Sequence, residues 1–419
     1  MPTSSKIIIS GNNPLIGEIT VSGSKNSALP ILASCLLTKG VNTVRSVPQL
    51  SDINIMYEIL SSLGAHVEQK NDTATIDCSN ITSCTTPYEL VSKMRGSFLL
   101  AGALLAAYSH ARICLPGGCP IGTRPVDLHL KGFAAMGAEI SQGHGYIDLY
   151  APKLHGAKIY LDFPSVGATE HLIMAATLAD GTTIIENAAA EPEIEDLSSF
   201  LNKRGAKIRG AGSDTVQITG VSDLGSAEHK IIPDRIEAGT FMAALAITRG
   251  KGKIKNVKLD HVRPMIAKLK EMNVEIAEEK SAVIIDACRD LISTDIKTMP
   301  FPGFPTDMQA QFSGLLSTTS GTGVIVETVF ENRFLHIGEL QRMGAHIKID
   351  GRTSVVEGVS HLTGARVKAA DLRGGAALVL AGLSAGGTTE ITDAQHIHRG
   401  YENLVQKLTE LGANIYEEN

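Results

Sequence analysis

The sequence predicts an α/β protein built from six repeats, arranged as two lobes of three repeats each. An amphipathic helical pattern ends six times in a small-residue turn that leads directly into a β-like stretch. The turns recur at intervals of 73, 68, 68, 71 and 68 residues, and a near-constant period is the signature of a repeat architecture. The length of 419 residues also exceeds what one hydrophobic core usually supports. The central residues of the six turns are Gly64, Gly137, Gly205, Asn273, Gly344 and Gly412.

Each repeat is expected to be a βαβαββ-type unit. In the first repeat, a helix rich in small residues covers 27–37 and a strand covers 41–44. The apolar residues within 53–63 follow the i, i+3, i+4 spacing of a half-buried helix, and two short strands at 66–68 and 73–77 close the unit. The corresponding small-residue helices of the later repeats are predicted at 98–108, 169–179, 239–248, 310–319 and 375–385.

The start of the chain should complete the last repeat. That repeat ends at Asn419 after a single closing strand, and residues 6–10 form a strand of the missing type. We therefore expect residues 1–22 and 233–419 to form a C-terminal lobe of repeats 4–6, and residues 23–232 to form an N-terminal lobe of repeats 1–3. Two crossings of the chain between lobes would act as a hinge, and a hinge implies a cleft that closes.

Composition excludes several classes of function. The net charge of −6 argues against nucleic-acid binding, because such domains are usually basic. The first ten residues lack the apolar core of a signal peptide, and the longest apolar run has about half of the ~20 residues that span a membrane. The 6 cysteines contain no C-x-x-C pair and the 13 histidines show no metal-ligand spacing. We expect a cytoplasmic protein without metal, cofactor or membrane contact.

Basic residues stand where helices are predicted to begin. The start of a helix suits anions, and a capping residue such as Ser, Thr, Asp or Asn is the ordinary occupant there. We interpret the whole set as convergence on a polyanionic ligand, although any single member could equally form a surface salt bridge. The set comprises Lys25, Arg95, Arg124, Arg333, Arg373 and Arg399.

The segment 115–124 is a second candidate for function. It holds three Gly and two Pro, and a long irregular loop between a strand and a helix is usually functional. Cys119 lies five residues before Arg124, so its thiol either donates a proton or is shifted by the cation towards thiolate. The alternative is a surface loop with an incidental cysteine. Cys35, Cys114 and Cys288 lie in apolar segments and are expected to be buried and unreactive.

Three aspartates at predicted helix starts are ambiguous. An acidic residue in this position is most often an N-cap, and for Asp307 taken alone the cap is the favoured interpretation. Asp234 and Asp371 carry the same ambiguity between capping and chemistry.

Five motifs together resemble the UDP-N-acetylglucosamine enolpyruvyl transferases, within the enolpyruvyl transferase family. They are Gly-Ser-Lys-Asn-Ser-Ala-Leu-Pro at 23–30, Pro-Gly-Gly-Cys-Pro-Ile-Gly-Thr-Arg-Pro at 116–125, Phe-Pro-Thr-Asp-Met-Gln at 304–309, Asp-Leu-Arg at 371–373 and His-Arg-Gly-Tyr-Glu at 398–402. The resemblance runs from end to end of the chain.

The resemblance implies a fold of two inside-out α/β barrels and a specific reaction. Phosphoenolpyruvate and UDP-N-acetylglucosamine would give the 3-O-enolpyruvyl ether and phosphate, the first committed step of peptidoglycan synthesis. It further implies that the protein is a monomer and needs no cofactor. Fosfomycin would inactivate the protein at Cys119.

The resemblance also implies roles for individual residues. Cys119 would protonate the methylene carbon of phosphoenolpyruvate, Asp307 would take the proton of the sugar hydroxyl, and Asp371 would orient Arg373. Lys25, Arg124 and Arg399 would hold the phosphate and carboxylate, supported by Arg95, Arg333 and Arg373. The residues implied for the nucleotide-sugar site are Asn26, Arg95, Pro125, Val126, Asp127, Leu128, His129, Ser165, Val166, Gly167 and Val329, with Glu191 and Asp234 close to the reacting centre.

One departure and two alternatives stand beside this interpretation. Many relatives have Lys where this chain has Phe163, so one cationic contact to the diphosphate is missing or supplied elsewhere. The enzyme that transfers enolpyruvyl to shikimate 3-phosphate shares the repeat architecture, but the Cys119 loop and the 304–309 motif argue against it. An inactive repeat scaffold would not need Lys25, Arg124, Asp307 and Arg399 together.

Overall fold

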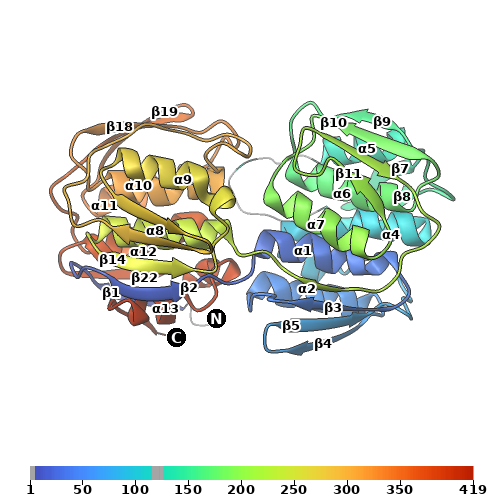
Figure 1. Ribbon diagram of the computed structural model, residues 1–419, viewed down its shortest axis with the longest axis horizontal. Helices are drawn as coiled ribbons and strands as arrows, with labels where there is room; N and C mark the ends of the chain where they lie inside the picture. Colours follow the sequence, from blue (N-terminus) through green and yellow to red (C-terminus); the bar gives the residue numbers. More distant parts are fainter. Residues whose placement is uncertain (1–4, 116–121, 123–125, 419) are drawn as a thin grey trace. The chain divides into compact units, whose positions relative to one another are not determined.

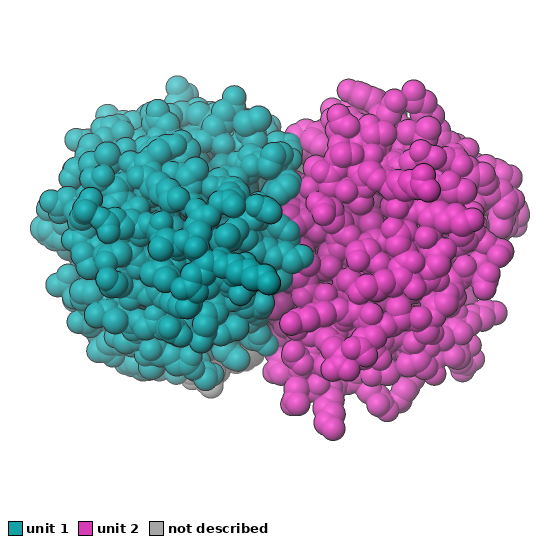
Figure 2. Space-filling view, viewed as in Figure 1, with its two compact units in different colours: residues 1–22, 119–123, 233–419 teal, residues 23–118, 124–232 magenta. Residues whose placement is uncertain are grey.

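The computed structural model describes residues 5–115, 122 and 126–418. The predicted site residues Cys119, Arg124 and Pro125 therefore lie outside the described residues. The chain forms two compact units, coloured separately in Figure 2: unit 1 comprises residues 1–22, 119–123 and 233–419, and unit 2 comprises residues 23–118 and 124–232. Helices and strands alternate along both units, which confirms the predicted α/β class (Figure 1). Each unit has its own hydrophobic core.

Among the described residues, the strands of unit 1 form three four-stranded sheets, in the orders β21-β22-β1-β23, β15-β16-β14-β2 and β17-β18-β20-β19. In each sheet three strands run antiparallel and the fourth joins in parallel, as β2 does beside β14. The strands are β1 Lys6–Ser10, β2 Ile16–Thr20, β14 Lys251–Lys255, β15 Glu275–Glu279, β16 Ala282–Asp286, β17 Ile296–Lys297, β18 Thr322–Val326, β19 His346–Asp350, β20 Thr353–Glu357, β21 Arg366–Lys368, β22 Thr388–Thr392 and β23 Asn414–Glu418.

Among the described residues, unit 2 has two sheets of the same kind, in the orders β13-β3-β5-β4 and β11-β12-β10-β9, and a third sheet of three antiparallel strands in the order β6-β8-β7. Buried and exposed residues alternate along most of these strands, because one face of each sheet packs on the core and the other faces solvent. The strands are β3 Val41–Arg45, β4 His66–Lys70, β5 Thr73–Asp77, β6 His110–Cys114, β7 Glu139–Gly143, β8 Tyr146–Tyr150, β9 Lys158–Tyr160, β10 Thr182–Glu186, β11 Lys207–Arg209, β12 Thr215–Thr219 and β13 Glu228–Lys230.

The first two strands of the chain, β1 and β2, belong to two different sheets. β1 pairs antiparallel with both β22 and β23, so the strand predicted at 6–10 is confirmed and completes the sheet of the last repeat. The expectation that all of residues 1–22 join the last repeat is wrong, because β2 pairs in parallel with β14, with Ile19 opposite Ile254. The physical reason is that β14 would otherwise present an unpaired edge, which the parallel partner covers, as β21 does for β22.

The small-residue helices lie in the interior of each unit. All eight residues of α10 are buried, and α8, α10 and α12 pack on one another in unit 1 (Figure 1). In unit 2, α4 packs against α1 and α6, and a Cβ added at Gly102 of α4 would lie 2.7 Å from the His171 carbonyl oxygen of α6. Small residues therefore allow these backbones to approach closely. In the described part of the chain, no helix has the length and apolarity needed to cross a membrane.

Several helices begin two to four residues before the predicted start, because a capping side chain extends them. Ser24 caps α1, Ser165 caps α6 and Asp234 caps α8. The helices of unit 1 are α8 Arg235–Ile247, α9 Leu259–Glu271, η3 Thr306–Met308, α10 Gln309–Leu316, α11 Ile337–Arg342, α12 Leu372–Ser384, η4 Ala394–Arg399 and α13 Leu404–Glu410. Those of unit 2 are α1 Lys25–Ser34, η1 Cys35–Leu37, α2 Ser51–Ser62, α3 Tyr88–Val91, η2 Arg95–Leu99, α4 Leu100–Tyr108, α5 Asp127–Ala135, α6 Val166–Thr177 and α7 Pro192–Lys203.

The six periodic turns share one backbone conformation. Their central residues all have positive φ, from +72° at Asn273 to +108° at Gly64. The next residue donates its N–H back to the last turn of the helix, as Ala65 does to the Leu60 carbonyl at 3.0 Å. This is the Schellman termination, in which Gly or Asn is preferred because other side chains strain the left-handed conformation. The sequence period therefore records six identical helix ends.

Candidate active site

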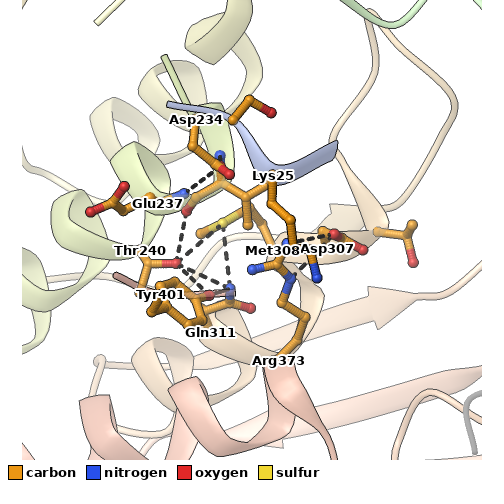
Figure 3. Close-up of polar contacts among 12 residues, drawn as sticks. Lys25, Asp234, Glu237, Thr240, Asp307, Met308, Gln311, Arg373 and Tyr401 are labelled. Atoms are coloured by element: carbon orange, nitrogen blue, oxygen red, sulfur yellow. Dashed lines mark hydrogen bonds and ion pairs between the residues drawn. The ribbon is translucent and has the colours of Figure 1, made fainter. Parts of the chain in front are cut away.

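Asp307 in η3 lies between two arginines of unit 1. Its Oδ1 accepts a hydrogen bond from Arg333 Nη2 at 2.7 Å, and its Oδ2 accepts from Arg373 Nη2 at 2.8 Å and Nε at 3.2 Å (Figure 3 shows Asp307 and Arg373). Both guanidinium groups are buried, whereas the Asp307 side chain is 26% exposed. Burial raises the pKa of Asp307, but the charges of Arg373 and Arg333 outweigh it and hold this pKa well below its usual range. Asp307 is therefore ionised and doubly paired.

The cap interpretation of Asp307 is wrong. Pro305 occupies the N-cap position of η3, and no side chain caps that helix. Asp307 instead faces Arg333 and Arg373, which follow it by 26 and 66 residues. A sequence-local rule favoured the cap because these distant partners are invisible to it.

Asp371 and Asp234, by contrast, are N-caps. Asp371 Oδ1 accepts from the backbone N–H groups of Arg373 and Gly374, both at 2.9 Å, at the start of α12. Asp234 caps α8 through the N–H groups of residues 236 and 237, at 2.8 and 2.9 Å. The Asp371 cap fixes the backbone from which the Arg373 side chain extends to Asp307.

A chain of hydrogen bonds continues from Arg333. Its Nη1 donates to Thr306 Oγ1 at 3.1 Å, and the Thr306 hydroxyl donates to Glu327 Oε2 at 2.9 Å. The other Glu327 oxygen accepts from the N–H groups of Val329 and Phe330, at 2.8 and 3.1 Å. The sequence analysis did not select Thr306 or Glu327. The available signal was an acidic residue directly after the Val/Ile-rich strand β18.

Arg373 also contacts the Tyr401 ring, whose hydroxyl belongs to a group of uncharged polar side chains. The Arg373 guanidinium carbon lies 5.3 Å from the centre of the Tyr401 ring, within the range of a cation–π contact. The Tyr401 hydroxyl lies 3.0 Å from Thr240 Oγ1 and from Gln311 Nε2 (Figure 3). Burial raises the pKa of Tyr401, which keeps the hydroxyl protonated. The sequence analysis quoted the 398–402 motif but gave Tyr401 no role.

In unit 2, Lys25 opens α1 and pairs with an acid that the sequence analysis did not select. Lys25 Nζ lies 3.0 Å from Asp52 Oδ2, and both residues are buried. Asp52 stands in the first turn of α2, where an acidic residue also favours the helix dipole. Asn26, next to Lys25, is half-buried.

The structure brings the 127–129 and 165–167 segments together. A Cβ added at Gly167, in the first turn of α6, would lie 3.2 Å from His129 Cε1 of α5. Val126, Leu128 and Ser165 are half-buried beside this contact, and Asp127 is exposed. Part of the predicted nucleotide-sugar site thus converges within unit 2.

The acidic residues at the start of α7 lie near a second carboxyl group. Glu191 occupies the N-cap position without capping the helix and is 8% exposed. Burial raises the pKa of Glu170 on α6, and the charges of Glu193 and Glu191 raise it further. Glu170 is therefore neutral, and sequence analysis overlooked it.

The remaining basic candidates lie at short helices. Arg95 begins η2 and Arg399 ends η4, and both are half-buried. Phe163 is 41% exposed, and the adjacent Asp162 pairs with Lys131 Nζ of α5 at 2.8 Å. A cation thus lies beside this segment although Phe163 itself carries none.

Of the three cysteines predicted to be buried, two are buried and one is exposed. Cys35 and Cys114 are buried, and burial raises the pKa of Cys35 to about 11. Cys288 is exposed, so its predicted burial is wrong; it lies beyond the end of β16, where its N–H donates to Asp286 Oδ1 at 3.3 Å. Across residues 5–115, 122 and 126–418, no group of three or more His, Cys, Asp and Glu is arranged to hold a metal ion.

The chain is similar to known proteins over nearly its full length. The family model for EPSP synthase (3-phosphoshikimate 1-carboxyvinyltransferase) matches residues 9–408. UDP-N-acetylglucosamine 1-carboxyvinyltransferase 1 of Caldanaerobacter subterraneus subsp. tengcongensis is 56% identical over 411 residues, which cover 98% of this chain and 99% of that protein. The UDP-N-acetylglucosamine 1-carboxyvinyltransferase of Halothermothrix orenii is 50% identical over 410 residues, covering 98% and 99%.

Two solved structures are also similar. The enolpyruvyl transferase NikO from Streptomyces tendae superposes with a TM-score of 0.90 at 26% identity, covering 99% of each chain. An EPSP synthase from Acinetobacter baumannii superposes with a TM-score of 0.78 over the full length of both chains, at 18% identity. The latter likeness is one of fold alone.

Proposed function

The chain belongs to the EPSP synthase family of enolpyruvyl transferases, and from that premise we propose that it transfers the enolpyruvyl group of phosphoenolpyruvate to the 3-hydroxyl of UDP-N-acetylglucosamine and releases phosphate. The observation that carries the proposal is the 56% identity, over 98% of the chain, with an enzyme named for this reaction. The reaction is the first committed step of peptidoglycan synthesis and runs in the cytoplasm, on a monomer, without a cofactor.

The proposal extends to the architecture. The six sheets among the described residues, three in each unit, suit two inside-out barrels of three βαβαββ repeats, with the helices inside and the sheets outside. Residues 1–22 and 233–419 form the C-terminal lobe in this interpretation, and residues 23–232 form the N-terminal lobe.

Each catalytic role follows from the chemistry of the transfer. The oxygen of the 3-hydroxyl bonds to C2 of phosphoenolpyruvate while Asp307 takes its proton, and the Cys119 thiol protonates the methylene carbon. The tetrahedral adduct then loses phosphate and a methyl proton, which restores the double bond. Lys25, Arg124 and Arg399 hold the anionic groups, and fixed charges of this kind stabilise charge that develops in a transition state.

Asp307 can act as a base only after one of its partners moves. A carboxylate held by two guanidinium groups has a low pKa and little affinity for a proton. Arg333 Nε and Arg373 Nη1 each lack a hydrogen-bond partner among the described residues, so both arginines retain a donor for a substrate anion. An anion that drew one guanidinium away would raise the pKa of Asp307 when substrate is bound. The base role is therefore tied to phosphoenolpyruvate binding.

The remaining residues bind the nucleotide sugar. Asn26, Arg95, residues 125–129, Ser165–Gly167 and Val329 contact it, and Glu191 and Asp234 lie close to the reacting centre. Lys131, paired with Asp162, is a candidate to replace the cation that Phe163 lacks.

A phosphate-release assay tests the proposal. Purified protein and phosphoenolpyruvate are mixed with UDP-N-acetylglucosamine, with shikimate 3-phosphate, or with neither. We expect release only with UDP-N-acetylglucosamine. Release with shikimate 3-phosphate would assign the chain to the sister activity, and an intact fold with no release under any condition would favour a repeat scaffold.

A further inference from the structure

A buried aspartate of unit 2, Asp196 on α7, accepts hydrogen bonds from three distant residues. Its Oδ2 accepts from Ser27 Oγ of α1 at 2.5 Å and from the backbone N–H of Ile232 at 3.2 Å. Its Oδ1 lies 2.9 Å from His229 Nε2, and the Asp196 and His229 side chains are only 5% and 4% exposed. Asp196 therefore joins α7 to α1, which packs against it (Figure 1), and to the segment 229–232.

Lys203, at the end of α7, indicates which nitrogen of His229 carries the proton. Its Nζ lies 3.1 Å from His229 Nδ1. A lysine ammonium has donors and no acceptor, so Nδ1 must accept this hydrogen bond. The His229 ring is then neutral, with its proton on Nε2, and this N–H donates to Asp196 Oδ1. His229 thus fixes the orientation of the Asp196 carboxylate.

The hydrogen bonds of Asp196 enclose the first turn of α1. Ser24, which caps α1, donates its backbone N–H to the Ile232 carbonyl oxygen at 2.8 Å. Ile232 donates its own N–H to Asp196, which also accepts from Ser27. The residues on either side of positions 25–26 are therefore bound to one frame. The two residues between them are predicted to bind the substrates.

A nucleophilic role for Ser27 does not fit this geometry. In a Ser-His-Asp triad the serine contacts the imidazole, whereas Ser27 contacts the carboxylate of Asp196. Ser27 is also fully buried. Ser27, His229 and Asp196 thus share the residue types of a triad but not its order, and their contacts support positioning rather than covalent chemistry.

We propose that Asp196, oriented by His229, is a positioning residue that holds the first turn of α1 so that Lys25 and Asn26 meet the substrates in a fixed geometry. The binding roles of Lys25 and Asn26 rest on the proposed function, but the hydrogen-bonded frame does not. Asp196 touches no substrate in this role. The Lys25 side chain is held separately by Asp52, whose Oδ2 lies 3.0 Å from Nζ, so the frame acts on the backbone from which that side chain extends.

Hydrogen exchange of the ligand-free protein tests the frame without any substrate. Ser27→Ala removes the hydroxyl that contacts Asp196, and amide exchange at residues 27–29 should become about 10-fold faster, the loss of one hydrogen bond. Ser198→Ala is the matched control, because it removes a buried hydroxyl of α7 that has no hydrogen-bond partner among the described residues. The control should leave exchange at residues 27–29 unchanged. Equal exchange there in the two variants would overturn the proposal.

Substrate binding tests the consequence. Ser27→Ala should raise the Kd of UDP-N-acetylglucosamine and the KM for phosphoenolpyruvate about 10-fold, with a smaller change in kcat, because residues 25 and 26 lose their fixed position. Ser198→Ala should leave Kd and KM unchanged. Equal weakening by Ser198→Ala, or a loss of kcat alone in Ser27→Ala, would overturn the proposal.

A pair of variants tests the part played by His229. In Asp196→Asn, either orientation of the amide sets its NH2 group against an N–H donor, that of His229 or that of Ile232. We therefore expect Kd and KM to rise about 10-fold. Adding Lys203→Met removes the donor at Nδ1, so the His229 proton can move there and Nε2 can accept from the amide. Both constants should then return close to the parent values, and a double variant as weak as Asp196→Asn would overturn the proposal.

Two controls complete the test. Lys203→Met alone should leave Kd and KM unchanged, because His229 Nε2–H keeps Asp196 as its acceptor, and a 10-fold loss in this single variant would overturn the proposal. Nitrogen-15 spectra of labelled histidine should show His229 protonated on Nε2 in the parent protein and on Nδ1 in the double variant. A parent protein inactive with UDP-N-acetylglucosamine would overturn the proposed function, while hydrogen exchange and the spectra would still decide the frame.

Discussion

Asp307 of unit 1 and His171 of unit 2 hold their protonation states by opposite means. Asp307 is kept ionised because Arg333 and Arg373 surround its carboxylate with positive charge. His171 is kept neutral because its surroundings exclude water and a second histidine competes for the proton. Charge pairing sets the first state and desolvation the second.

The difference matters for how each cluster can respond to a ligand. An anion can compete for the arginines of Asp307, because an ion pair exchanges partners when another charge arrives. His171 differs, since burial disfavours its ionised form. We therefore expect a bound anion to change the pKa of Asp307 and to leave His171 neutral.

The largest expected effect comes from Asp307→Asn. Turnover should fall about 10²–10⁴-fold, the usual contribution of a general base. Stability should fall as well, by about 3 kcal/mol, because two buried guanidinium groups lose their counter-charge. Steady-state kinetics and chemical unfolding measure the two effects.

Asp371→Asn is the control for Asp307→Asn, since asparagine can still cap α12 and that variant should keep its stability. Near-normal turnover in Asp307→Asn at neutral pH would move the base role to Asp371 or Glu191.

The next expected effect concerns the cysteines, because nearby charges change the pKa of a thiol and therefore its reactivity. Fosfomycin should modify Cys119 alone, and Cys119→Ser should lose most turnover. Cys119→Asp should retain activity, because a carboxylic acid also donates a proton, yet resist the epoxide. Peptide mapping after brief treatment reports the modified site.

Cys288 is the matched thiol for this experiment. Cys288 is exposed, but a hydrogen bond between its thiol and Asp286 raises the pKa of the thiol, so little of it is thiolate near neutral pH. Labelling of the exposed Cys288, or of the buried Cys35 or Cys78, ahead of Cys119 would contradict the assignment of the reactive thiol.

A smaller effect is expected in the pH dependence of stability, which should differ between His171 and Asp307. A pKa lowered on folding stabilises the fold above the unfolded value, and this contribution is lost as pH falls. Histidine has an ordinary pKa of 6.5, so the stability due to neutral His171 should decline below about pH 6.5. The ordinary value for aspartate is 3.8, so the Asp307 contribution should decline only below about pH 4. Each slope is at most about 1.4 kcal/mol per pH unit.

Hydrogen exchange of α6 and of α12, measured from pH 7 to pH 4, can report the two units separately. His171→Phe should flatten the decline in α6 between pH 6.5 and pH 4.5, within the window set by the lowered pKa of His171. His336 of unit 1 has a pKa lowered to about 4 by burial, so some decline should persist in α12 over the same range. An α6 profile unaltered by His171→Phe would refute the neutral, buried state of this ring.

The smallest effect is expected from Tyr401→Phe. The ring beneath Arg373 remains, but Thr240 and Gln311 each lose a partner, which should cost about 1–2 kcal/mol of stability and reduce turnover less than about 10-fold. Tyr57→Phe in unit 2 is the matched control, because the buried Tyr57 hydroxyl has no partner among the described residues, and its removal should be nearly neutral. Equal effects of the two changes in thermal unfolding would show that the Tyr401 hydroxyl contributes nothing specific.

Features that depend on neighbouring residues could be predicted from the sequence. The six helix ends were readable because a Schellman turn requires Gly or Asn at one position and bonds only residues within the same turn. The α/β alternation followed from periodicity, and the strand at 6–10 from the incomplete last repeat. The motifs around Lys25 and Asp307 marked the places where the repeat carries residues that packing does not explain.

The pairing of those residues depends on the fold and could not be predicted from the sequence. Asp307 meets arginines 26 and 66 residues away, and His129 meets a histidine 42 residues away, so no local rule could tell a cap from an ion pair or find the histidine contact. The parallel pairing of β2 with β14 and the exposure of Cys288 likewise depend on which sheet edge needs a partner and where a strand stops. Short-range hydrogen bonds can be inferred from the order of residues, because both partners lie in one segment. Ion pairs, sheet edges and proton positions depend on distant residues that only folding places next to one another.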